Sequence, residues 1–274
     1  MELTLTAADG YRLGATLFGP SSKNAVLVMP ATGVPQTYYA KFAAYLAERG
    51  FKVLTFDYRG IGKSLSTSIK ELPARMRDWV LLDAAAAFNI LNDSEKLLVI
   101  GHSFGGQTLG LLPSPERIAA ALIVGSQSGY WRNWPPLGRA WMWPATHFML
   151  PGLSKLLGYF PASRLGFGAD LPAGVAIEWA SWCRNPTYLV GALRAEDSYA
   201  RFAAPLRAYA LSDDAFAPVA AVQALPELYP RSKAELRRVR PAEVGARSIG
   251  HFGFFRESFR DTLWREAVDW LEAQ

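Results

Sequence analysis

The chain has 274 residues, of which half are hydrophobic and about a fifth are charged, a composition that excludes an intrinsically disordered protein. This length suits one large domain, with or without an insertion, and is enough to bury a sizeable core. The single cysteine, Cys183, excludes a disulfide framework within the chain. The net charge of +5 is mild, and the densest basic stretch (231–241) has no interleaved aromatic residues, which argues against nucleic-acid binding.

The sequence contains no segment typical of targeting or of membrane insertion. The first ten residues include Glu2 and Asp9 and lack the apolar core of a signal peptide. No stretch approaches the roughly 20 apolar residues of a membrane helix. We therefore expect a cytoplasmic protein without stable membrane insertion and without a nucleic-acid partner. The oligomeric state stays open, a homodimer included.

The first part of the chain alternates short apolar strands with helices. Two strands are expected around a turn at 9–10. Four further strands follow, apolar on both faces as strands covered on both sides are, at 25–29, 52–56, 96–100 and 118–124. Helices are expected between them, one of which runs from about 72 to 91, and another follows residue 103. This alternation predicts a mostly parallel sheet flanked by helices. It resumes after residue 204 with strands at 206–212 and about 235–240, and with helices at about 218–228 and 258–272.

Residues 129–204 break this alternation. Six of the nine tryptophans lie here, together with many prolines and glycines. A crossover between two strands needs far fewer residues. We therefore expect a mainly helical cap at 129–204, inserted into a core made of residues 1–128 and 205–274; the alternative is an unusually long crossover.

The sequence GHSFGG at 101–106 follows the apolar strand KLLVI and precedes a helix. The pattern Gly-x-Ser-x-Gly between a strand and a helix is typical of a nucleophile elbow, a tight turn that lifts the serine hydroxyl above the sheet. Small residues are needed around Ser103 because the strand and the helix approach each other closely. The helix that follows directs its N-terminal N–H groups toward developing negative charge. Ser103 is therefore the candidate nucleophile.

At this point the chain resembles the α/β-hydrolase family over essentially its whole length. The motifs FDYRGIGKS, GHSFGG, SDDAFAP and GHFGFF occur in the order that this family uses. Within it, the chain is similar to a bacterial group of α/β-hydrolases whose substrates are undefined. The resemblance implies an α/β-hydrolase fold, an acyl-enzyme mechanism and a serine–histidine–aspartate triad.

Only three histidines can serve as the base that a serine nucleophile needs. His251 lies in a glycine-flanked loop before the last helix, where the resemblance places the general base. His102 adjoins Ser103, so its side chain should point away from the elbow, and we interpret it as structural. His147 lies in the predicted cap, as a packed or surface residue that could also line the pocket.

The base needs a carboxylate that fixes its tautomer. Asp213 and Asp214 both follow the strand at 206–212. Asp214 stands four residues before Pro218, which resembles the family loop, so it is the preferred triad acid. Asp213 stays the alternative and Asp197 a distant third.

The resemblance implies an oxyanion hole made of two backbone N–H groups. One belongs to Phe104, the residue after the nucleophile. The other is expected from Thr32, with Gly33 as the alternative, because Pro30–Ala31 replaces the His-Gly pair that is common in the family. No metal-ligand spacing and no phosphate-binding loop is present, so we expect no metal and no cofactor.

The parts together predict a serine hydrolase, a carboxylesterase acting on a small apolar ester-type substrate with a small or medium acyl group. Aromatic residues of the predicted cap should line its pocket: Trp131, Trp134, Trp141, Trp143 and Phe148. A thioester, lactone, amide or carbon–carbon bond stays open because the same triad cleaves them all. Two other classes also stay open, a receptor on this fold that turns over slowly and a lid that docks on membrane surfaces.

Overall fold

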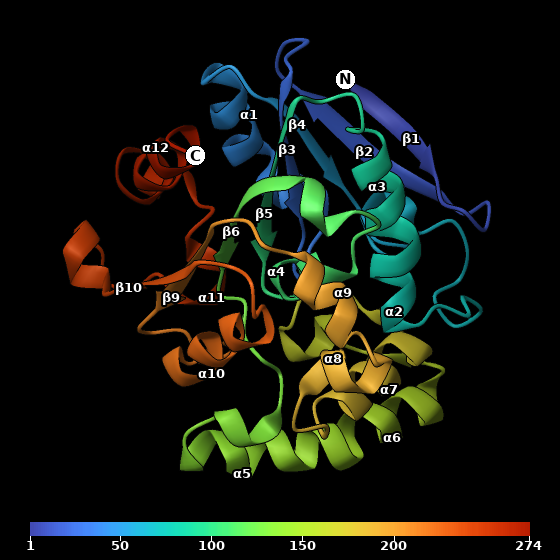
Figure 1. The fold of residues 1–274 in the computed structure, drawn as a ribbon. Helices are drawn as coiled ribbons and strands as arrows, with labels where there is room; N and C mark the ends of the chain where they lie inside the picture. Colours follow the sequence, from blue (N-terminus) through green and yellow to red (C-terminus); the bar gives the residue numbers. More distant parts are fainter.

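The computed structural model describes all 274 residues and has an eight-stranded sheet at its centre (Figure 1). The strand order is β1-β2-β4-β3-β5-β6-β9-β10. The strands are β1 (Glu2–Thr6), β2 (Arg12–Phe18), β3 (Asn24–Met29), β4 (Lys52–Phe56), β5 (Lys96–His102), β6 (Ile118–Val124), β9 (Leu206–Leu211) and β10 (Ala234–Val239). β2 pairs antiparallel with β1 and β4, and every other neighbouring pair is parallel. The predicted mostly parallel sheet is therefore confirmed.

The α-helices that the sequence predicts are shorter in the structure than their patterns indicate. The helices of the structure are α1 (Ala40–Glu48), α2 (Met76–Asp78), α3 (Ala85–Asn89), α4 (Phe104–Gln107), α5 (Pro136–Pro144), α6 (Leu150–Leu157), α7 (Ala173–Trp182), α8 (Tyr188–Leu193), α9 (Glu196–Arg201), α10 (Val219–Ala224), α11 (Gly250–Gly253) and α12 (Arg265–Glu272). The helix expected at about 72–91 begins only at Met76 and contains a π-helical stretch at Trp79–Ala84. The helix after Ser103 has a single turn, followed by a 3₁₀ turn at Leu109–Leu111.

Successive side chains of the central strands point to opposite faces of the sheet and pack into two separate hydrophobic cores. In β3, Val26 and Val28 point to the core that α1 and α12 cover, whereas Leu27 and Met29 point to the other one. This alternation is the period of two that a strand imposes. Because every strand from β3 to β6 is apolar on both sides, the sheet must be covered on both faces, as the sequence pattern predicts.

The chain between β6 and β9 contains α5 to α9 and a short antiparallel pair, β7 (Tyr159–Phe160) with β8 (Leu171–Pro172). Figure 1 shows α5 to α8, in green to yellow-orange, in the lower part of the molecule, whereas α9 lies higher, beside α4. The residues between β6 and β9 are mostly helical, and the boundaries 129–204 stay our prediction for the cap. None of the helices is both long enough and apolar enough to cross a membrane.

The carboxyl ends of β3, β5, β6 and β9 lead into loops on the side of the sheet that faces α5 to α7. Residues in the loops that follow these four strands line one cavity together with residues of those helices. In an open parallel sheet, ligands bind at this edge. A ligand site is therefore expected among these loops.

Candidate active site

Ser103 connects β5 to α4 in a strained turn. Its φ of 49° and ψ of −116° lie outside the ordinary regions for an L-residue, and only Tyr188 and Arg194 share a positive φ among the residues with side chains. The Ser103 N–H donates to the Val124 carbonyl at 2.9 Å, which helps to hold the turn. Backbone strain of this kind persists only where the surrounding structure imposes it, and it clusters at functional sites.

Close approach of the backbone explains the glycines around Ser103. A Cβ atom on Gly101 would lie 2.3 Å from the Gly106 Cα atom, and one on Gly105 would lie 2.1 Å from the Met29 carbonyl oxygen. No real Cβ contact is that short, so β5, α4 and the end of β3 can meet only where side chains are absent. The crowding of glycines in GHSFGG therefore follows from packing at the turn.

The structure brings His251 and Asp214 together and separates Asp213 from them. His251 Nδ1 lies 2.7 Å from Asp214 Oδ2, and both side chains are buried. The other carboxylate oxygen of Asp214 accepts the N–H groups of Phe216 and Ala217, each at 2.8 Å. Both oxygens of Asp214 are thus fixed, and one of them orients the imidazole.

Asp213 instead binds the backbone of the loop that carries His251. Its Oδ2 accepts the N–H groups of Ile249 at 2.8 Å and Gly250 at 3.1 Å. Partial burial opposes the charged form, but these N–H donors hold the pKa of Asp213 below its ordinary value. Asp197 is exposed on α9 and does not line the cavity.

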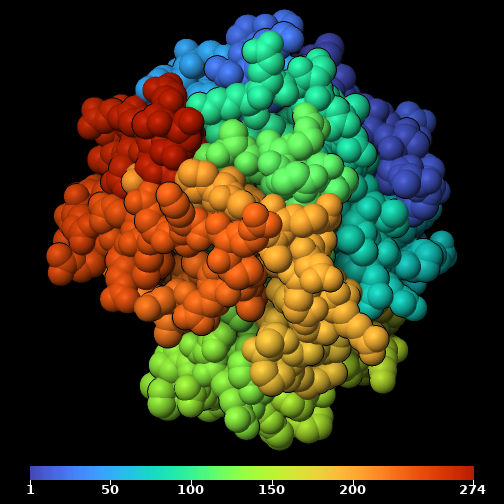
Figure 2. All heavy atoms as spheres, in the orientation of Figure 1, coloured from blue at the N-terminus to red at the C-terminus, as the bar shows by residue number.

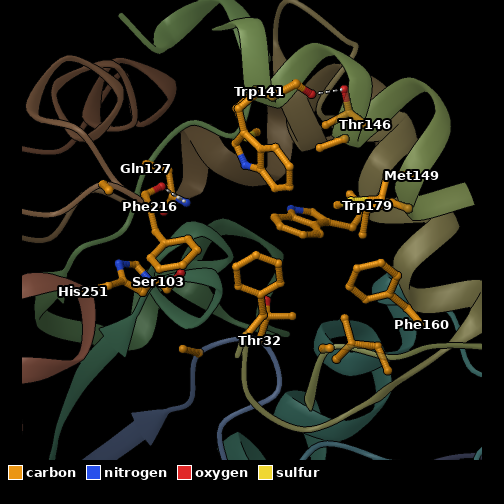
Figure 3. Close-up of a pocket in the computed structure, with 18 of the residues that line it drawn as sticks. Thr32, Ser103, Gln127, Trp141, Thr146, Met149, Phe160, Trp179, Phe216 and His251 are labelled. Carbon is orange, nitrogen blue, oxygen red and sulfur yellow. Dashed lines mark hydrogen bonds between the residues drawn. The ribbon is translucent and has the colours of Figure 1, made fainter. Parts of the chain in front are cut away.

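Ser103, His251 and Thr32 line the same cavity, and Figure 3 shows Ser103 and His251 side by side at one end of it. No hydrogen bond joins Ser103 Oγ to His251 here; contacts of this kind often tighten only when a substrate is bound. The Thr32 N–H donates no backbone hydrogen bond, and the Phe104 N–H, as the first of α4, has no acceptor within that helix, so both can bind a ligand. Gly33, the alternative to Thr32, does not line the cavity.

The cavity has a volume of about 130 Å³ and is lined by 20 residues, 15 of them hydrophobic. His251 is its only titratable side chain. Of the five aromatic residues predicted for the pocket, Trp134 and Trp141 line it, and Figure 3 shows Trp141 and Trp179 pointing into its middle. Several further lining residues were not singled out from the sequence: Gln127, Met149, Phe160, Phe167, Trp179 and Phe216.

Trp131, Trp143 and Phe148 do not line the cavity. Trp143 and Phe148 are largely exposed, and the Trp143 ring stacks on His147 with the centroids 5.0 Å apart. Position along the helix explains the difference. Trp141, Ala145 and Met149 are spaced four residues apart, so they lie on the side of the helix that faces the cavity. Positions 143 and 148 are not part of this row. His147 stays outside the cavity too.

A family model described as the alpha/beta hydrolase family matches residues 26–262. The chain belongs to the alpha/beta hydrolase family. Among curated proteins, the chain is 31% identical to the polyketide transferase grgF of a Penicillium species over 128 residues (45% of this chain and 44% of that protein). It is 32% identical to cutinase 2 of Thermobifida cellulosilytica over 119 residues (42% and 45%). The match thus spans less than half the length of these curated relatives.

Solved structures support the same fold for the hydrolase. An esterase of Pyrococcus furiosus aligns with a TM-score of 0.64 at 18% identity, over 100% of this chain and 90% of that one. A thermophilic esterase of Thermogutta terrifontis aligns with a TM-score of 0.63 at 16% identity, over 100% and 98%. At such identities the likeness establishes the alpha/beta hydrolase fold.

His102 occupies a buried hydrogen-bond chain of the hydrolase, away from the cavity. Its Nε2 lies 2.9 Å from the His251 carbonyl, which can only accept, so Nε2 carries the proton. Its Nδ1 then accepts from the Tyr39 hydroxyl at 2.8 Å, and that hydroxyl accepts the Ala31 N–H at 2.9 Å. Burial, aided by the charge of the nearby His251, lowers the pKa of His102 well below its ordinary value, so the ring stays neutral. The expected structural role fits this position.

A second chain of hydrogen bonds links the predicted cap to the loops of the hydrolase core. The Trp179 indole N–H donates to the Tyr188 hydroxyl at 2.9 Å, which donates to Gln107 Oε1 at 2.9 Å. Gln107 Nε2 donates to Gln127 Oε1 at 3.1 Å, and Gln127 Nε2 donates to the Phe216 carbonyl at 3.3 Å. Three of these five residues line the cavity, so the series of hydrogen bonds fixes the positions of cavity-lining residues relative to one another.

Gly125 was not singled out from the sequence. It has a φ of +54°, and a Cβ atom there would lie 3.1 Å from Asp214 Oδ2 and 3.2 Å from His251 Nδ1. A glycine directly after a predicted strand was the only signal. No group of three or more His, Cys, Asp or Glu side chains in the hydrolase is arranged to hold a metal ion.

Proposed function

We propose that this alpha/beta hydrolase is a serine hydrolase that cleaves a carboxylic ester through an acyl-enzyme. Ser103 is the nucleophile, His251 the general base and acid, and Asp214 the carboxylate that orients His251. The observation that carries this proposal is the hydrogen-bonded His251–Asp214 pair beside a strained serine at one end of an apolar cavity. The names of relatives and structural neighbours, cutinase and esterase, fit ester hydrolysis.

In the first step, His251 Nε2 takes the proton of Ser103 Oγ while Oγ bonds to the ester carbonyl carbon. The imidazolium is stabilised because its Nδ1–H faces Asp214 Oδ2. The negative charge on the former carbonyl oxygen is bound by the N–H groups of Thr32 and Phe104. Collapse breaks the bond to the alcohol, which leaves with the proton from Nε2. Water, deprotonated by the same nitrogen, then releases the acid and restores Ser103.

The cavity supports an uncharged, apolar acyl group. No lysine, arginine, aspartate or glutamate lines it, so a charged substrate group would lose its hydration without gaining a partner. A volume of about 130 Å³ is similar to a cavity that accepts a single benzene ring. We therefore expect short aliphatic or single-ring acyl groups to be processed faster than long chains.

Labelling with a fluorophosphonate probe, followed by mass spectrometry of the modified peptide, tests the nucleophile without knowledge of the substrate. We expect the label on Ser103. Ser103→Ala and His251→Ala should each lower kcat/KM on a p-nitrophenyl ester by about 10⁴-fold or more, with little change in Tm. His147→Ala is the matched control and should stay within about twofold, because His147 lies outside the cavity.

Three outcomes would overturn the proposal: a label on another residue, wild-type rates in Ser103→Ala, or equal losses in His147→Ala and His251→Ala. Tight ester binding without an acyl-enzyme burst would instead assign the fold to a slow-turnover receptor.

A further inference from the structure

The outer end of the molecule is formed by one long, nearly continuous helical stretch, residues 136–157, which we call the cap helix. It consists of α5, a π-helical turn at Ala145–Met149, and α6. Its inner face lines the cavity through residues such as Met142, Ala145 and Met149. In Figures 1 and 2, α5 lies at the lower edge of the molecule, and no other part of the chain lies below it in this view. We call the face of the cap helix that is turned away from the cavity its outer face.

The cap helix exposes large apolar side chains. Leu137 is 90% exposed, Leu156 79%, Phe148 62% and Trp143 44%, and Trp141, which also lines the cavity, is 48% exposed. These are five of the eleven large hydrophobic residues that the whole molecule exposes, and they lie on a single 22-residue segment. A concentration of this kind marks a surface that binds something apolar.

The charge around the cap helix has one sign. No aspartate or glutamate occurs between Glu116 and Asp170, whereas four cationic residues lie in 129–169, namely Arg132, Arg139, Lys155 and Arg164. All four are exposed, and none forms an ion pair. The nearest acidic residues in sequence after this stretch are engaged elsewhere, because Asp170 accepts from Ser163 and Glu178 pairs with Arg77.

We propose that the outer face of the cap helix docks on the surface of a bilayer that contains anionic phospholipid. Exposed Trp, Phe and Leu side chains beside unpaired Arg and Lys are the composition of a helix that lies in a membrane interface. Basic residues near such a surface are attracted by the negative potential of anionic headgroups. A second copy of the chain fits less well, because the cap helix carries Arg139 and Lys155 and no acidic residue, so two copies of it would repel each other.

The same face is continuous with the mouth of the cavity. Trp141 is both exposed and cavity-lining; its ring lies 6.5 Å from Phe167, which lies 5.6 Å from Phe216. The Phe216 ring is in turn 5.5 Å from His251. A row of aromatic rings thus leads from the docking face to the proposed base, and an apolar ester dissolved in the bilayer could enter along it. This last step rests on the proposed function, whereas docking itself does not.

Co-sedimentation of the full chain with vesicles tests the docking. We expect binding to phosphatidylcholine vesicles with about a third phosphatidylglycerol, and at least tenfold weaker partitioning to pure phosphatidylcholine. Leu137→Glu combined with Leu156→Glu should lower partitioning to anionic vesicles at least tenfold. Neither residue lines the cavity, so hydrolysis of a dissolved ester should stay within about twofold. Ile90→Glu combined with Leu81→Glu is the matched control, because both residues are exposed apolar positions near α3; it should bind as the wild type does.

Absence of binding to anionic vesicles, or an equal loss in the control variant, would overturn the proposal. A dimer in light scattering that Leu137→Glu converts to a monomer would assign the face to a second copy and overturn it too. Ser103→Ala should bind vesicles like the wild type. Vesicle binding is measured without catalysis, so a failure of docking and a failure of the proposed hydrolysis give different results.

Discussion

Two adjacent carboxylates of the chain make different contacts. Asp214 faces His251, whereas Asp213 accepts two backbone N–H groups of the loop that carries His251. Asp214→Asn should lower kcat by about 10⁴-fold, because an amide in its place favours the wrong tautomer of the imidazole. Asp213→Asn should lower it by less than about tenfold, because the remaining amide oxygen can still accept both N–H groups. Steady-state kinetics on a p-nitrophenyl ester measures both variants.

Urea unfolding of the two variants is the control for this comparison. Both should unfold cooperatively, which would separate a catalytic loss from a structural one. If Asp213→Asn were the slower enzyme, Asp213 rather than Asp214 would be the residue that acts on the base.

At the scale of single residues, the sequence could name Ser103 and His251 because a local motif and a short supply of histidines single them out. The structure pairs Asp214 with His251, the preference that the spacing to Pro218 indicated. Gln127, Trp179 and Phe216 could not be named, because each lies on a different element and only the tertiary fold brings them to one cavity. Their spacing in the sequence does not indicate that they line the same cavity.

At the scale of elements, the sharp meeting of β3, β5 and α4 depends on the lack of a side chain at Gly105. Gly105→Ala should lower the free energy of unfolding by about 3 kcal/mol, at the upper end of overpacking costs, because its Cβ would lie 2.1 Å from a backbone oxygen that cannot rotate away. Gly152→Ala is the matched control: it lies in α6 with nothing within 4 Å of the added atom. Alanine there should raise stability by about 1 kcal/mol through helix propensity.

Urea denaturation should show a lower free energy of unfolding for Gly105→Ala and a higher one for Gly152→Ala than for the wild type. A Gly105→Ala protein as stable as the wild type would show that the turn has room to relax. The packing argument for GHSFGG would then be wrong.

Some properties of the elements could be predicted from sequence patterns, and others could not. The central strands β3 to β6 were predictable because each is an apolar run between turn residues. The phase of the cap helix was not: whether Trp141 or Trp143 faces the cavity depends on how the helix is rotated against β7, α7 and the loops below it. A π-helical turn in its middle shifts that phase further, and no residue type announces such a turn.

At the scale of the whole molecule, the predicted cap and the sheet share one hydrophobic core. Its members include Leu27 and Val99 of the sheet as well as Leu150, Val175 and Trp182 from the chain between β6 and β9. A segment with its own separate core could open alone, whereas one that shares the core of the sheet loses apolar contacts on both sides when it opens. We therefore expect the two parts to unfold together.

Cys183 tests this expectation, because it is the only thiol, it is fully buried at the end of α7, and it belongs to the shared core. Burial raises the pKa of its thiol, which suppresses the reactive thiolate further. Labelling by a disulfide reagent should thus require opening, with a free energy within about 1 kcal/mol of the global value from urea unfolding and with the same dependence on urea. Labelling that is several kcal/mol easier, with a shallow dependence on urea, would instead mean that the cap opens while the sheet stays folded. The shared core predicts the first result.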